Sequence, residues 1–253
     1  MIELGLPEIE VVPDSSSLAE RAADEFVRLA GEALQIGSRF TVALAGGSTP
    51  QRMYTRLAGA QVDWRGVHVF WGDERCVPPG HADSNYRMAD EALLSHVPIP
   101  RGNLHRIPGE LPVEEAAQDY EDELRRFFSN KTPRFDLVLL GLGEDGHTAS
   151  LFPGSSAILE KEQWVAAVRH SVPPPPLVDR VTLTLPVLNA AAQVLFLVSG
   201  ADKAERLAQV LDGPSQPDVL PAQAVKPVNG AVRWLVDQAA AAKLPPQQHQ
   251  TRA

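Results

Sequence analysis

Cysteine is nearly absent from this chain, because Cys76 is the only one among 253 residues. One thiol cannot form an intramolecular disulfide, so the sequence predicts a fold without disulfides and favours a reducing compartment, the cytoplasm. Long apolar stretches are missing too: the purest runs, 137–140 and 194–198, are far shorter than the roughly 18 residues that cross a bilayer. Two glutamates and a proline stand among the first eight residues, where an export signal would need a basic flank and an apolar run, so we expect no export signal there.

Positive charge is also in short supply. The chain has 23 Lys and Arg against 32 Asp and Glu, which gives a formal net charge of −9 and an isoelectric point near 5.3. Such a chain has no overall field that attracts a nucleic-acid backbone or an anionic membrane surface. We therefore expect neither nucleic acid nor membrane as a partner.

The remaining composition is that of a folded globular protein, with 44% hydrophobic, 6% aromatic and 22% charged residues and a mean hydropathy of −0.14. These values exclude the disordered, collagen-like and membrane-spanning classes. No break divides the chain, so we predict a single domain over residues 1–244 and a frayed polar tail over 245–253. The four prolines at 173–176 predict an extended connector.

Short apolar, β-branched runs alternate with helical patterns along most of the chain, as in repeated β-α-β units. Several of these runs are apolar on both faces, which is typical of strands in a mostly parallel sheet that is covered by helices on both sides. The predicted fold class is therefore α/β. We predict strands at 10–12, 40–44, 67–71, 136–140, 164–168, 181–185, 194–198 and 233–236, and helices at 17–35, 49–57, 84–94, 114–128 and 203–211.

Ligands bind at the carboxyl ends of the strands in open parallel sheets, and three predicted strand ends are unusual. The first carries AGGSTP at 45–50, where Gly46 and Gly47 allow close backbone approach and Ser48 or Thr49 could cap the next helix. Free N–H groups at that helix start suit phosphate, although a tight turn with nothing bound would have the same sequence. Pro50 replaces the glycine that a nucleophile elbow requires, so Ser48 is a poor nucleophile.

The second strand end carries GDERC at 72–76, a dense charged cluster. Asp73 or Glu74 could position a proton donor, and Asp73 is one of our catalytic candidates. The guanidinium of Arg75 could hold a phosphate or carboxylate through two hydrogen bonds. The alternative is a solvated, salt-bridged turn. Cys76 has no adjacent histidine base and is best interpreted as a packed side chain.

The third strand end carries GLGEDGHTASLFP at 141–153, which contains Gly-x-Gly-x-x-Gly. A dinucleotide site would need an acidic residue at the end of the next strand, but that strand is followed by Arg169 and His170. The loop instead presents Asp145 and His147, and a histidine there can act as a general base while the carboxylate fixes its tautomer. A histidine bonded to backbone in a turn is the alternative.

A metal centre is not predicted, because the histidines are scattered without ligand spacing and no His-x-x-x-His pair occurs. We also expect no organic cofactor, because neither a dinucleotide-binding unit nor a Walker loop with Gly-Lys-Ser/Thr is present.

Taken together, AGGSTP at 45–50, WGDER at 71–75, LGLGEDGHTASLFPG at 140–154 and RVTLT at 180–184 resemble the 6-phosphogluconolactonase family. The segments match in order and spacing over most of the chain, about residues 40–234, and DGHTASLFP is the most specific of them. The resemblance implies a Rossmann-like sheet, shared with glucosamine-6-phosphate isomerase/deaminase. It also implies hydrolysis of the small molecule 6-phospho-D-glucono-1,5-lactone to 6-phosphogluconate in the oxidative pentose phosphate pathway. We expect a monomer or weak dimer.

The resemblance also implies roles for particular residues. His147 would activate water, with Asp145 beside it, and residues 46–49 would hold the 6-phosphate. Arg75, Arg180 and Lys203 would face the substrate as cations. From the residues alone, Lys203 could be an ordinary surface lysine and Arg180 could lie at a strand edge.

Two other functions are compatible with such a sheet. The isomerase/deaminase family carries Phe-Asn-Glu-Pro after its histidine, with a glutamate that transfers a proton, whereas this chain has SLFP at 150–153. Phe152 cannot transfer a proton, so the sequence favours the lactonase. A sugar-phosphate sensor domain of a transcriptional regulator would need a DNA-binding module, for which the acidic chain offers neither room nor charge.

Overall fold

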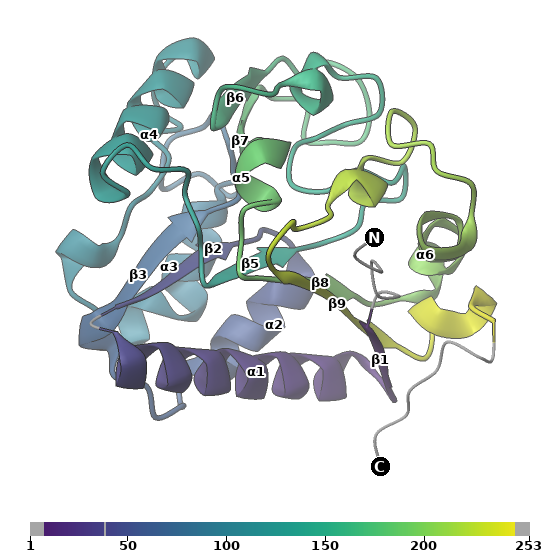
Figure 1. Cartoon of the computed structure of the whole chain (residues 1–253), viewed down its shortest axis with the longest axis horizontal. Helices are drawn as coiled ribbons and strands as arrows, with labels where there is room; N and C mark the ends of the chain where they lie inside the picture. The colour runs from purple at the N-terminus through teal and green to yellow at the C-terminus, as the bar shows by residue number, and fades with distance from the viewer. Residues whose placement is uncertain (1–7, 38, 246–253) are drawn as a thin grey trace.

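A parallel six-stranded sheet forms the centre of the protein, which we describe from a computed structural model over residues 8–37 and 39–245. The strand order is β1-β9-β8-β5-β2-β3, and every neighbouring pair is parallel (Figure 1). The strands are β1 (Glu8–Val12), β2 (Phe40–Leu44), β3 (Val67–Trp71), β5 (Leu137–Leu140), β8 (Gln193–Val198) and β9 (Ala231–Asp237). The predicted α/β fold with a Rossmann-like, mostly parallel sheet is confirmed.

Helices cover both sides of this sheet, as predicted; Figure 1 shows α1 along one side and α5 on the other. The helices are α1 (Ser15–Ile36), α2 (Ser48–Leu57), α3 (Asn85–Ala92), α4 (Val113–Phe127), α5 (Leu185–Leu188) and α6 (Ala204–Asp212). Local capping fixes some of their starts. Asp14 accepts hydrogen bonds from the backbone N–H groups of Ser16 and Ser17 at α1, and Ser84 accepts one from Arg87 at α3. No helix in the described ranges is long and apolar enough to span a bilayer.

Two predicted strands do not join the parallel sheet, which is a correction. β6 (Val165–Val168) and β7 (Arg180–Leu183) pair with each other in antiparallel fashion, and β4 (Asp73–Arg75) completes a separate three-stranded sheet. An apolar run indicates that a strand is buried, but it does not indicate whether the neighbouring strand is parallel or antiparallel. The sequence pattern therefore could not distinguish the two sheets. β4 was not predicted as a strand, because its charged sequence has no strand pattern and its pairing with β7 comes from tertiary structure.

Most predicted element ends differ from the structure by one or two residues, and two local features differ more clearly. Leu185, predicted to end a strand, instead begins α5 directly after β7. The prolines at 173–176 do not form an extended connector, because the chain bends over residues 172–175 between β6 and β7. Of the predicted frayed tail, only residue 245 is among the described residues; positions 246–253 lie outside them.

Candidate active site

A cavity of about 700 Å³ lies at the carboxyl ends of β2, β3 and β5. The chain leaves β2 toward β3 on one side and leaves β5 toward β8 on the other, so the crossovers diverge between β2 and β5. Such a divergence opens a crevice at the strand ends, which explains why the cavity forms there. All three unusual strand ends from the sequence contribute to its wall, together with residues of β7 and the start of α6.

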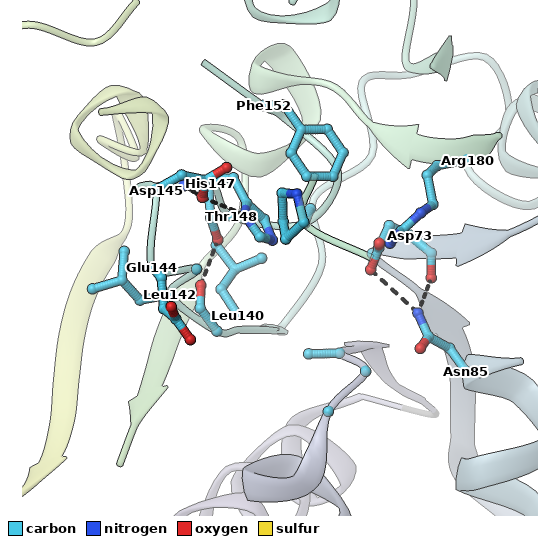
Figure 2. Close-up of a pocket in the computed structure, with 18 of the residues that line it drawn as sticks. Asp73, Asn85, Leu140, Leu142, Glu144, Asp145, His147, Thr148, Phe152 and Arg180 are labelled. Carbon is cyan, nitrogen blue, oxygen red and sulfur yellow. Dashed lines mark hydrogen bonds and ion pairs between the residues drawn. The ribbon is translucent and has the colours of Figure 1, made fainter. Parts of the chain in front are cut away.

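Asp145 and His147 lie in the loop that follows β5, on the cavity wall (Figure 2). Asp145 Oδ1 lies 2.5 Å from Nδ1 of the His147 ring and accepts the backbone N–H of His147 at 3.0 Å. Burial alone would raise the pKa of Asp145, but the hydrogen bonds and charge of His147 outweigh burial and hold that pKa below its usual range. An ionised carboxylate only accepts, so Nδ1 carries a proton in both the charged and the neutral imidazole, and in the neutral form Nε2 keeps its lone pair.

Two glycines allow this loop to fold around the histidine. A Cβ on Gly143 would lie 2.1 Å from His147 Nδ1, so only glycine leaves room for the ring beside the backbone. Gly146 has a φ of +90°, which L side chains rarely adopt. The Gly143 N–H donates to the His147 carbonyl at 2.9 Å and closes the loop. The glycines of this loop therefore allow the His147 imidazole to take its position.

Asp73 lies across the cavity from His147 and is held by two neighbours (Figure 2). Its Oδ2 accepts the Ser150 hydroxyl at 2.6 Å, and its backbone carbonyl accepts the side-chain amide of Asn85 at 2.9 Å. Asp73 is almost fully buried, so these bonds fix a carboxylate at the cavity wall.

Glu74, which the sequence offered as an alternative to Asp73, has a structural role: it stabilises the start of a helix. Its carboxylate accepts the backbone N–H groups of Asn85 and Tyr86, both at 2.7 Å, and the Ser84 hydroxyl at 3.0 Å. These groups form the start of α3, so Glu74 caps that helix from a neighbouring strand. Burial raises the pKa of Glu74, although the hydrogen bonds oppose this effect. Glu74 does not line the cavity.

The three predicted cations all line the cavity. Arg180 is buried and donates to the carbonyls of Val178 at 3.3 Å and Pro176 at 3.0 Å; burial lowers its pKa. Arg75 donates through Nη1 to the carbonyl of Asp83 at 2.6 Å, and its buried Nε has no hydrogen-bond partner among the described residues.

Lys203 completes this set from the start of α6. Its Nζ lies 3.2 Å from Asp202 and 3.6 Å from Glu144, both with well-exposed side chains. Exposed pairs of this kind are weak, so the ammonium group remains available to a stronger anion.

The AGGSTP turn reaches the cavity through Gly46 and Gly47, while Ser48 and Thr49 are not part of its wall. Gly47, with a φ of +102°, is the N-cap residue of α2, and no side chain of the described residues caps this helix. The expectation that Ser48 or Thr49 caps it is therefore wrong, because both already belong to the first turn. The uncapped N-terminus of α2 begins directly beside the cavity wall.

Two lining residues were not singled out from the sequence. Asn85 packs so closely on the AGGSTP turn that a Cβ on Gly46 would lie 2.0 Å from its Oδ1. Nothing in the local sequence marks it, since it arrives from α3. Arg206 donates from Nε to the carbonyl of Glu144 at 2.7 Å and supports the histidine loop. It follows Lys203 by three positions, and this helical spacing could have indicated a shared face.

Cys76 does not behave as a nucleophile here. Burial raises the pKa of its thiol to about 11, so the reactive thiolate is scarce near neutral pH. Among residues 8–37 and 39–245, no group of three or more His, Cys, Asp and Glu side chains has a geometry that could hold a metal ion.

The fold and the cavity define an α/β protein whose site combines a histidine–aspartate pair with several cations, an arrangement suited to a small anionic molecule. Residues 13–234 match the family model described as glucosamine-6-phosphate isomerases/6-phosphogluconolactonase. A 6-phosphogluconolactonase of Nostoc sp. is 41% identical over 242 residues, which cover 93% of this chain and 98% of that protein.

Solved structures agree with this relationship. A 6-phosphogluconolactonase from Trypanosoma cruzi superposes with a TM-score of 0.85 at 30% identity, covering 94% of this chain and 97% of that one. A 6-phosphogluconolactonase from Thermotoga maritima gives a TM-score of 0.78 at 35% identity, covering 91% and 99%. The chain belongs to the glucosamine-6-phosphate isomerase/6-phosphogluconolactonase family, and the resemblance noted in its sequence is confirmed.

Proposed function

We propose that this protein hydrolyses 6-phospho-D-glucono-1,5-lactone to 6-phosphogluconate, a step of the oxidative pentose phosphate pathway. The observation that carries the proposal is the Asp145–His147 pair, whose Nδ1 contact of 2.5 Å leaves Nε2 free in a cavity lined by cations. The highly similar relatives named 6-phosphogluconolactonase support the same activity.

The reaction is a general-base hydrolysis. His147 Nε2 removes a proton from water while the water oxygen attacks the carbonyl carbon of the lactone, and the carbonyl becomes a tetrahedral oxyanion. When this intermediate collapses, the bond between the former carbonyl carbon and the ring oxygen breaks. The imidazolium returns the proton to the ring oxygen, which becomes a hydroxyl group, and the new carboxylic acid then ionises. Asp145 stabilises the imidazolium between the two proton transfers.

The oxyanion needs hydrogen-bond donors that are already in place. The guanidinium of Arg75 and the backbone N–H groups of the glycine-rich turns both lie at the cavity wall; in this proposal the N–H groups bind the oxyanion and Arg75 binds the phosphate. Asp73 lies opposite the histidine loop as a fixed carboxylate, where it suits the sugar hydroxyl groups as an acceptor and counterbalances Arg180.

The phosphate would bind at the turn of residues 46–49, against Gly46 and Gly47, which line the cavity, and against the first turn of α2, to which Ser48 and Thr49 belong. The positive end of α2 begins there, and free helix N-termini attract phosphate. Arg75, Arg180 and Lys203 supply the charge that a phosphate dianion requires. Together these groups would hold the substrate so that its lactone carbonyl faces His147.

Phe152 favours hydrolysis over the deaminase reaction. Its ring centroid lies 4.6 Å from that of His147, so an apolar ring occupies the place where the deaminase family carries its proton-transferring glutamate. A phenyl group cannot supply that proton transfer.

A coupled assay tests the proposal. A glucose-6-phosphate dehydrogenase generates the phosphorylated lactone in situ, and a 6-phosphogluconate dehydrogenase reports the acid as it forms. We expect added protein to accelerate acid formation well beyond the spontaneous reaction. Equal rates with and without the protein would overturn the proposal.

A further inference from the structure

His170 is a buried histidine outside the wall of the cavity. It follows β6, only 4% of its surface is exposed, and it does not line the cavity. Its ring nevertheless stacks on Phe152 at a centroid distance of 4.2 Å and an interplanar angle of 16°. Phe152 in turn contacts the His147 ring at 4.6 Å. His170 thus reaches the proposed base through one intervening aromatic ring.

The same imidazole holds the proline segment that forms part of the cavity wall. His170 Nε2 lies 2.6 Å from the carbonyl oxygen of Pro174. A carbonyl can only accept, so Nε2 must carry the proton, and the tautomer of His170 is defined. Pro173, Pro174 and Pro175 line the cavity.

Proline composition explains why this segment needs an external donor. Four successive prolines have no N–H group, so positions 173–176 cannot donate the backbone hydrogen bonds that usually order a loop. Two of their carbonyls are instead bound by side chains from outside the segment. His170 binds the carbonyl of Pro174, and Arg180, at the start of β7, binds that of Pro176 at 3.0 Å.

We propose that His170 is a positioning residue with two separable tasks in the lactonase reaction. Its Nε2–H fixes the proline wall against which the substrate lies, and its ring supports Phe152 and thereby the orientation of the His147 imidazole. The proposal rests on the proposed function, because it assigns His170 a role in that same site.

Two substitutions separate the tasks. His170→Phe keeps an aromatic ring for stacking but loses the donor to Pro174. His170→Gln places an amide N–H near the position of Nε2 but loses the stacked ring. We expect His170→Phe to raise KM roughly 10-fold with kcat within about 2-fold, and His170→Gln to lower kcat roughly 10-fold with KM within about 2-fold, because small displacements of bound groups cost activity of this order.

His96 offers a matched control. Its Nε2 lies 2.9 Å from the carbonyl oxygen of Glu91, which is the same kind of contact, but on an exposed site that does not line the cavity. We expect His96→Phe to leave both kinetic constants unchanged. Identical kinetics in wild type and both His170 variants, or an equal loss of kcat in both with KM unchanged, would overturn the proposal.

Two readouts do not depend on activity. Nitrogen NMR of the wild-type imidazole should show His170 protonated at Nε2. Hydrogen exchange at the Cys76 amide, which donates to the Asp179 carbonyl at 2.8 Å just beyond the proline segment, should accelerate in His170→Phe but not in His170→Gln. If His170 carried its proton on Nδ1 alone, or if hydrogen exchange were equal in both variants, His170 would not anchor the proline segment of the cavity wall. If the wild type lacked lactonase activity, the proposed function would fail, and these measurements would still decide whether His170 anchors the proline segment.

Discussion

Asp145 contacts His147 twice, through the ring Nδ1 at 2.5 Å and through the backbone N–H at 3.0 Å. Both contacts come from one carboxylate oxygen, two positions earlier in the same loop. The imidazole is therefore oriented by its own loop, while the rest of the chain determines what it faces. The predictions below follow from this arrangement and from the charges around it.

Loss of the base should nearly abolish catalysis. His147→Ala is expected to lower kcat/KM for the phosphorylated lactone by roughly 10²–10⁴, the usual contribution of a general base. The coupled assay measures this after the spontaneous hydrolysis is subtracted, and circular dichroism checks that the variant is folded. Turnover close to wild type would show that another group activates the water.

The cations should make the enzyme selective for phosphorylated lactones. We expect kcat/KM for plain glucono-1,5-lactone to be orders of magnitude lower, since each charge-assisted hydrogen bond to phosphate contributes about 1.5–3 kcal/mol. Lys203→Ala should reduce this preference and leave the slow reaction of the plain lactone unchanged. Lys243→Ala is the matched control, because Lys243 forms an exposed ion pair with Glu205 away from the cavity. Equal kcat/KM values for both lactones in the wild type would indicate a general sugar lactonase.

Glucosamine 6-phosphate should not be deaminated. Phe152 lies against the His147 ring and offers no group for proton transfer. Ammonia release from this amino sugar should stay at the background rate, with a known deaminase assayed in parallel as a positive control. Ammonia above background would favour the isomerase/deaminase branch of the family.

Activity should survive chelation. The proposed steps use His147, water and fixed hydrogen-bond donors, and the described residues provide no three-ligand cluster. We expect unchanged rates after prolonged treatment with a chelator followed by gel filtration. Loss of activity that a divalent ion restores would contradict this mechanism.

Low pH should reduce the free energy of unfolding, in part through protonation of Glu25 on α1. Burial would raise the pKa of Glu25, but Arg28 and Arg233 outweigh it and lower the pKa to about 2 from an ordinary 4.5. A depressed pKa gives stability that is present above pH 4.5 and is lost as the pH falls toward 2.

Comparison with a neutral variant tests this effect. We expect Glu25→Gln to lower the free energy of unfolding at pH 7 by about 2 kcal/mol, a value reduced for the solvent screening of the half-exposed Arg28. Denaturant titrations between pH 2 and 7 should show the difference from wild type shrinking below about pH 4.5. A difference that stays constant over this range would mean that Glu25 acts by packing and not by charge.

Local sequence determined much of the parallel sheet. The predicted ranges for β2 and β3 match the structure residue for residue, because each is an apolar run bounded by polar or glycine turns and buried on both sides. Ser84 caps α3 by accepting a hydrogen bond from a backbone group three positions later, which is also a local interaction. The positions of Asp145 and His147 at a strand end also follow from local sequence, since the glycines, the carboxylate and the imidazole lie within one short loop.

Tertiary structure decided what depends on partners distant in sequence. The antiparallel sheet of β4, β6 and β7 forms because Asp73–Arg75 finds a partner strand more than 100 positions later, which no local pattern encodes. Asn85 reaches the cavity from another helix, and Glu74, similar to Asp73 in sequence, is directed to the start of α3. His170 contacts Phe152 only because β6 returns beside the histidine loop. Turns and caps depend on residues that are adjacent in sequence, so the sequence predicts them. The direction in which a buried charge or ring points depends on the element that packs against it, and that element can come from any part of the chain.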